Sequence, residues 1–201
     1  GNNLGIKKIK TDYAFILNPD IVLEPNSIDR LIEESKKLQS FGIISPIEVN
    51  EDYPNYKLID NSKKNTDTNE PLKVKSVDGY SMLINLKRLN QIDNFYYFDE
   101  NFFMYLENDD LCKRLNKKNE NIYIIPKSKI KHLGGQAVND KYKTEIELSR
   151  NWHWAWSKFY FNKKHYGYIF ALLNGLPNFI SSILKFIFYL ILNNKKKNIY
   201  L

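Results

Sequence analysis

The last quarter of the chain has no acidic residue. Residues 151–201 contain seven lysines and neither aspartate nor glutamate. Residues 1–150 contain 23 basic and 23 acidic side chains, so the whole formal net charge of +7 belongs to the C-terminal quarter. A basic segment of this kind favours an anionic partner, either a membrane surface or a nucleic acid. The balanced charge of the first 150 residues argues against nucleic acid as a partner.

Cysteine is nearly absent as well. The single Cys112 excludes an intrachain disulfide, is typical of a reducing compartment, and is expected to be simply buried. Composition excludes disorder, because 43% of the residues are hydrophobic and 26% are charged. A chain of 201 residues is long enough to bury one substantial core.

Short apolar runs alternate with helical patterns over the first two thirds of the chain. Residues 13–17 form a continuous apolar run that is typical of a strand buried on both faces, and Pro19 ends it. Residues 49–72 are polar and predict a surface loop. We expect further strands at 41–45, 122–125 and 129–132, and a strand region at 74–86 that breaks at Gly79. We expect helices at 25–38 and at 107–117. The first of these helices has one apolar stripe, formed by Ile28, Leu31, Ile32 and Leu38. This alternation predicts an α/β fold with a mainly parallel or mixed sheet.

The C-terminal part has a different pattern. Residues 141–165 predict one helix rich in aromatics, in which Trp152 and Trp154 are expected to belong to a core. The apolar run of residues 180–192 is shorter than the ~20 residues that a spanning helix needs, and Lys185 interrupts it. An amphipathic helix lying in the membrane interface, with aromatic and lysine anchors, therefore fits better than a spanning helix.

Acidic and aromatic residues crowd together between Tyr97 and Arg114. Carboxylates in such surroundings are candidates for a base or for the ligands of a metal or another cation. Upstream, Asp20 follows the strand of residues 13–17, and open α/β sheets bind ligands at the carboxyl ends of their strands. Downstream comes His132. An aspartate, then an acidic cluster, then a histidine is an order typical of a nucleotide-sugar site.

The motifs in question are Asn18-Pro19-Asp20, Asp78-Gly79 with Met82-Leu83-Ile84, the segment from Phe98 to Arg114, and Pro126 with His132-Leu133-Gly134-Gly135. In this order they closely resemble the motifs of bacterial family-2 glycosyltransferases of the rhamnosyltransferase-like branch. The resemblance covers roughly residues 1–165. It implies an inverting, nucleotide-sugar-dependent enzyme with a Rossmann-like catalytic domain of the GT-A type in residues 1–140, followed by a basic, membrane-associating helical tail in residues 141–201. It also implies that the first βαβ portion, on the order of one third of such a domain, is lacking here, as in a fragment or a decayed copy.

The resemblance implies a divalent cation, Mn²⁺ or Mg²⁺, that neutralises the leaving diphosphate. Asp20 matches the last acid of the family's metal motif, and His132 matches its downstream histidine. The alternative is that Asp20 is only a turn residue and that His132 is a hydrogen-bonded histidine at the end of a strand. The resemblance further places Asn3, Asn18, Asp78 and Gly79 near the nucleotide sugar.

Inversion needs a general base that deprotonates the acceptor hydroxyl. The family usually has this acid at the position of Asn108, which cannot take a proton. Glu107 is the first candidate and Asp110 the second, because positions i and i+3 of a helix share a face. Asp109 points away from both and is expected to be solvated or a cap. Alternatively, Glu107 and Asp110 only form ion pairs with Lys113 and Arg114.

The expected function is transfer of rhamnose or a similar hexose from a nucleotide sugar to a lipid-linked or polysaccharide acceptor in cell-surface glycan synthesis. The expected location is the cytoplasmic face of the bacterial inner membrane, with the basic tail on anionic lipid. Two other readings remain open. One is an inactive remnant that docks on membranes or on a partner, and the other is a basic single-stranded nucleic-acid binder.

Overall fold

The computed structural model describes residues 1–60, 69–134 and 143–192. The chain divides into two compact units. The first contains Gly1–Asp99 and Glu107–Ala137, and the second contains Glu100–Leu106 and Val138–Leu201. The boundary expected near residue 140 lies outside the described residues, and the sequence did not predict that residues 100–106 group with the second unit.

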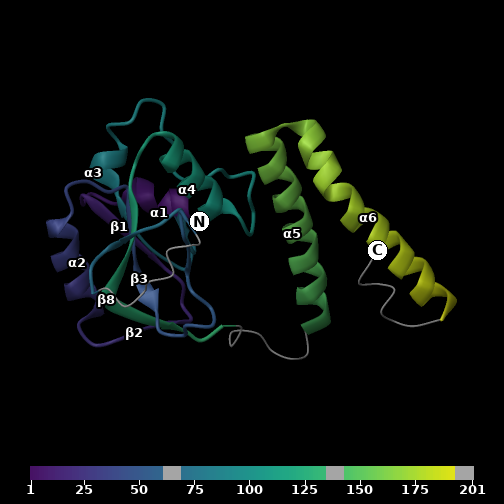
Figure 1. Ribbon diagram of the computed structural model, residues 1–201, viewed down its shortest axis with the longest axis horizontal. Coiled ribbons are helices and arrows are strands. Elements are labelled where there is room, and N and C mark those ends of the chain that lie inside the picture. The colour runs from purple at the N-terminus through teal and green to yellow at the C-terminus, as the bar shows by residue number, and fades with distance from the viewer. Residues whose placement is uncertain (61–68, 135–142, 193–201) are drawn as a thin grey trace. The chain divides into compact units, whose positions relative to one another are not determined.

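The first unit is a mixed α/β structure (Figure 1). Its elements are α1 (Asn2–Lys8), β1 (Tyr13–Leu17), β2 (Ile21–Leu23), α2 (Ser27–Lys37), β3 (Ile43–Glu48), β4 (Tyr56–Lys57), β5 (Leu72–Lys73), β6 (Ser76–Val77), β7 (Ser81–Asn85), α3 (Leu86–Leu89), α4 (Glu107–Lys117) and β8 (Ile122–His132). The main sheet has the order β1-β7-β3-β8-β2, and β5 pairs with β8. Among the strand pairs of the described residues, β3 with β8 is the one parallel pair, so the expected α/β fold with a mixed sheet is confirmed.

Alternate residues of the strands point to opposite faces and build two apolar layers. Ile43 and Ile84 belong to a core that includes α1 and α4, whereas Ile44 and Leu83 belong to a core that includes α2. The helix predicted at 107–117 is confirmed as α4. Cys112 of α4 is fully buried as predicted, and burial raises the pKa of its thiol to about 12.

Four details of the predicted elements are wrong. Strand β1 is an edge strand within the described sheet, so its ends Tyr13 and Leu17 are exposed rather than buried on both faces. Ile28 of α2 is 47% exposed, because the helix packs on the sheet through residues such as Leu31. The polar stretch 49–72 contains β4, which pairs with β6. The fourth is β8, which was predicted as two separate strands.

Strand β8 is one continuous element where two short strands were predicted. Ile125 pairs with Pro46 and Lys129 with Ile47, so residues 126–128 bulge out of the ladder. Pro126 has no N–H to offer, which explains why the pairing breaks there. The Ser128 hydroxyl donates to the Ser27 carbonyl at 2.7 Å and fastens the bulge to the start of α2.

The second unit contains two long helices, α5 (Lys143–Tyr166) and α6 (Tyr168–Ile191), together with the segment 100–106 (Figure 1). The predicted helix at 141–165 is confirmed as α5 within the described residues. Trp152 and Trp154 are exposed rather than part of a core. Helix α5 meets the segment 100–106 through Ser157 and through one edge-to-face contact between Trp154 and Tyr105. Phe102 and Tyr160 also meet edge to face at 4.9 Å between ring centroids.

Helix α6 is longer than the sequence analysis expected. It begins at Tyr168 rather than near residue 180 and has 24 residues, with Pro177 inside it. Among the described residues it is the one helix long and apolar enough to cross a membrane, by length and composition alone. The apolar helix is therefore longer than the predicted run of residues 180–192, because that run was ended at the polar residues that precede Ile180.

Candidate active site

Three strands end at the same edge of the sheet. Strands β1, β3 and β8 run in one direction, because β1 and β3 are both antiparallel to β7 and β3 is parallel to β8. Strands β2 and β7 begin at this edge. We call it the carboxyl edge, and it is where an open α/β sheet places ligand-binding residues.

The turn between β1 and β2 brings Asp20 to His132 across 112 positions of sequence. The Asn18 carbonyl accepts from the Ile21 N–H at 3.2 Å and closes the turn, and the Asn18 N–H donates to the Tyr80 carbonyl. The register of β2 on β8 then places Ile21 opposite His132. Asp20 Oδ2 lies 3.1 Å from His132 Nε2, and the two side chains are 22% and 31% exposed. Asp20 is thus a turn residue and is also accessible to a ligand.

Two residues that the sequence analysis missed hold His132 in place. Tyr80 stacks on the imidazole with 4.3 Å between ring centroids. Glu48 Oε2 accepts the backbone N–H of His132 at 2.9 Å. Glu48 follows a buried apolar run as Asp20 does, so the rule that singled out Asp20 could have found it. Burial raises the pKa of the Tyr80 phenol, and Asp78 and Glu48 raise it further.

The β6–β7 turn carries Asp78 and Gly79 toward helix α4. Burial raises the pKa of the Asp78 carboxyl, and the charge of Asp109 raises it further. A Cβ atom on Gly79 would lie 3.2 Å from Asn108 Cβ and 3.5 Å from Glu107 Oε1. The absence of a side chain at Gly79 therefore lets the turn lie close against the first residues of α4.

Glu107 is the first residue of α4, and the two residues before it, Tyr105 and Leu106, have φ angles of 69° and 64°. Burial raises the pKa of the Glu107 carboxyl, with a further contribution from Asp109. Its Oε2 atom is buried and has no hydrogen-bond partner in the structure. A carboxylate oxygen that is desolvated and uncommitted is suited to taking up a proton.

The neighbours of Glu107 are all committed to other groups. The Asn108 amide donates to the Val77 carbonyl at 2.9 Å. Asp109 forms an ion pair with Lys57 at 2.8 Å, so the prediction that it is solvated or a cap is wrong. Asp110 has a fully buried side chain and accepts from Arg114 Nε at 2.8 Å. The alternative of an ion pair therefore describes Asp110, and the geometry favours Glu107 as the base.

Asn3 makes its side-chain hydrogen bonds elsewhere. Its amide donates to the carbonyl of Phe98 at 2.8 Å, and its amide oxygen accepts the N–H of the same residue at 3.0 Å. Asn3 thus fixes the backbone of a loop, whereas Asn18, Asp20, Asp78, Gly79 and His132 are linked to one another through Tyr80 and the β6–β7 turn. Asn3 therefore lies outside the group of predicted site residues at the carboxyl edge.

No three side chains of His, Cys, Asp or Glu converge as a metal site within the described residues. Asp20 and His132 could supply one oxygen and one nitrogen ligand, a donor pair that suits Mn²⁺. Ions of this class usually take their remaining ligands from water and from phosphate oxygens of a substrate. The donor pair therefore fits a cation that binds together with a diphosphate.

No protein-family model matches the chain, and no curated protein matches it significantly.

Proposed function

We propose that the first unit belongs to the catalytic domain of an inverting glycosyltransferase of the GT-A type. In this proposal the enzyme moves rhamnose or a similar hexose from a nucleotide sugar to a lipid-linked or polysaccharide acceptor. The mixed sheet with helices on both faces is compatible with such a domain.

The observation that carries the proposal is the convergence of distant motif residues at one sheet edge. Asp20 meets His132 at 3.1 Å, and Tyr80 stacks on His132. The turn next to Tyr80 is packed against Glu107. Residues from four separate parts of the sequence thus form one group, and the resemblance assigns two of them, Asp20 and His132, to metal binding.

Each residue has a chemical role in this proposal. Asp20 and His132 would hold Mn²⁺ or Mg²⁺, which neutralises the charge of the departing nucleoside diphosphate. Glu107 accepts the proton of the acceptor hydroxyl as that oxygen attacks the anomeric carbon of the sugar. Its raised pKa brings the base closer to neutral pH, where proton transfer is efficient. Tyr80 and Glu48 position His132.

The second unit would bring this site to the membrane. Helix α6 exposes large apolar side chains along its length, and the segment 151–201 has no acid. Lysines around an apolar helix favour anionic lipid, and each contributes about 1 kcal/mol near such a surface. We place the protein at the cytoplasmic face of the bacterial inner membrane, where α6 either lies in the interface or spans.

The test is calorimetric titration of the full chain with UDP, dTDP and GDP, with and without MnCl₂. At least one of these should bind only with the metal, and Asp20→Ala should weaken that binding about tenfold or more. The matched control, Asp29→Ala, removes an exposed acid of α2 and should leave binding unchanged. Metal-dependent binding that survives Asp20→Ala would refute the proposed role of Asp20.

One observation favours the inactive remnant as a second candidate. Asn108 stands where the family usually has its base, and its amide is used structurally to hold the Val77 carbonyl. A remnant would bind vesicles containing phosphatidylglycerol but none of the three nucleotides. The transferase would bind both, and Glu107→Gln would abolish transfer while leaving nucleotide binding intact.

A further inference from the structure

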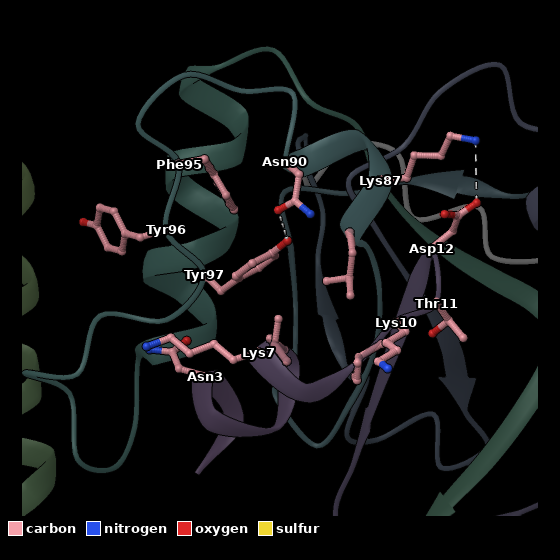
Figure 2. A pocket seen from close by; sticks show the side chains of 13 residues that line it. Asn3, Lys7, Lys10, Thr11, Asp12, Lys87, Asn90, Phe95, Tyr96 and Tyr97 are labelled. Carbon is pink, nitrogen blue, oxygen red and sulfur yellow. Dashed lines mark hydrogen bonds and ion pairs between the residues drawn. The ribbon is translucent and has the colours of Figure 1, made fainter.

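A second concave site lies along helix α1 and the turn that follows it. This hollow, which we call the α1 hollow, has a volume of about 700 Å³ (Figure 2). Cavities of roughly 300–1,000 Å³ are the usual size for small-molecule sites. The residues that line it include none of Asp20, Glu48, Asp78, Tyr80, Glu107 and His132. It is therefore a separate site from the carboxyl edge.

The charge around the α1 hollow is positive. Lys7, Lys10 and Lys87 line it, and Asp12 is the one acid among the lining residues. Asp12 faces Lys87 at 3.6 Å and offsets that charge. Lys7 and Lys10, at the α1 side of the hollow, leave an excess of two positive charges for a ligand (Figure 2).

The floor and one wall of the α1 hollow are apolar or aromatic. Ile6 and Leu86 are nearly fully buried beneath it. Tyr97 is directed toward Asn90, and its hydroxyl donates to Asn90 Oδ1 at 2.7 Å (Figure 2). Phe95 meets the Tyr97 ring edge to face at 5.5 Å between centroids. A flat apolar group can pack against this wall.

Side chains from helices α4 and α1 fix the backbone of the aromatic wall. The Arg114 guanidinium donates to the carbonyls of Tyr96 and Tyr97, and Arg114 is itself paired with buried Asp110. Asn3 holds the next residue, Phe98, by both its N–H and its carbonyl. A preformed wall lowers the ordering cost that a ligand would otherwise meet on binding.

We propose that the α1 hollow binds a small organic anion that joins a flat apolar or aromatic body to a phosphate, sulfonate or carboxylate. The body packs against Tyr97 and the buried floor, and the excess positive charge of Lys7 and Lys10 at the rim attracts the anionic group. This site is independent of the proposed transferase chemistry, because it uses neither Asp20 nor a metal ion.

The probe is 1-naphthyl phosphate, titrated into the full chain by calorimetry in buffer with EDTA. Lys7→Ala/Lys10→Ala should weaken its binding roughly tenfold. The matched control, Lys117→Ala/Lys118→Ala, removes the same charge from an exposed position of the same unit and should change binding less than about twofold. Neutral 1-naphthol and inorganic phosphate should each bind at least about tenfold more weakly than the joined molecule.

Equal weakening by the two double variants would overturn the proposal, because it would mean that the anion responds to overall charge alone. Absence of measurable binding to the wild-type chain at millimolar probe would overturn it too. Asp20→Ala should leave the binding of 1-naphthyl phosphate unchanged. The nucleotide titrations with Mn²⁺ test the transferase proposal, and the 1-naphthyl phosphate titration tests the α1 hollow, so either proposal can fail without the other.

Discussion

Replacing Glu107 by glutamine should stabilise the protein at neutral pH while removing its proposed base. In the structure the carboxyl is mostly buried, its pKa is raised, and Oε2 has no partner. A buried polar atom without a hydrogen bond costs about 1–3 kcal/mol, and more if it is charged. The variant amide has the same shape and carries no charge. We therefore expect the free energy of unfolding to rise by about 1 kcal/mol at about pH 8.

The effect should depend on pH in a defined direction. Because burial raises the pKa of Glu107 in the folded state, the folded protein keeps this proton after the unfolded chain has released it. The stability from this group is full below the unfolded-state pKa and is lost as the pH rises through the folded-state pKa. The variant does not titrate at this position, so its advantage over the wild type should be absent near pH 4 and should grow above that.

The measurement is urea denaturation of both proteins at several pH values between about 4 and 8, followed by far-UV circular dichroism. Tryptophan fluorescence is unsuitable, because all three tryptophans lie in the second unit, far along the sequence from Glu107. The control is Glu33→Gln, which removes an exposed acid of α2 and should give no pH-dependent difference. A variant whose stability relative to the wild type does not rise between about pH 4 and 8 would refute this reasoning, since it would mean that the fold does not raise the pKa of the Glu107 carboxyl.

Three further substitutions test the packing around the two sites by urea denaturation. Arg114→Met should lower the free energy of unfolding by about 3–5 kcal/mol, because it removes the guanidinium from buried Asp110. Adding Asp110→Asn should recover part of that loss, and no recovery would mean that the two side chains are not coupled. Asn55→Ala should cost about 2–4 kcal/mol, because the fully buried amide bonds the Glu48 N–H and the Pro46 carbonyl, and a cost below about 1 kcal/mol would show that water replaces it. Gly5→Ala should stabilise by about 0.5–1 kcal/mol, since the added methyl meets no atom within 4 Å on helix α1, and destabilisation would contradict the helical assignment there.

Local patterns predicted some elements well and others poorly. Helix α4 was predicted at its observed bounds, because acids at its start, basic residues at its end and an apolar stripe all agree. The run at 13–17 was misjudged, because an apolar strand looks the same in sequence whether it lies at the centre or at the edge of a sheet. The continuity of β8 through its bulge was missed, because it depends on pairing with β3, which is some 80 residues away in the sequence.

The candidate site could be predicted in part. The approach of Asp20 to His132 followed from the motif resemblance, and the register of β2 on β8 explains it. The roles of Glu48 and Tyr80 could not be obtained in this way, because they depend on contacts between separate strands. The choice between Glu107 and Asp110 likewise needed three dimensions. It rests on the carboxylate that Arg114 reaches, which is Asp110, about one helical turn before it, and not Glu107, about two turns before it.

The two residues before Glu107 have a mechanical consequence. Tyr105 and Leu106 both adopt left-handed backbone angles, which bulky side chains rarely do and which store strain of the order of 1–3 kcal/mol each. Such a conformation persists only where neighbouring contacts enforce it, and those contacts come from α5, where Tyr105 packs on Trp154 and Ser157 donates to the Met104 carbonyl. Removing the Trp154 ring or the Ser157 hydroxyl would thus leave this backbone free to relax. Helix α5 holds the residues of its own unit in a conformation that the chain would not adopt alone.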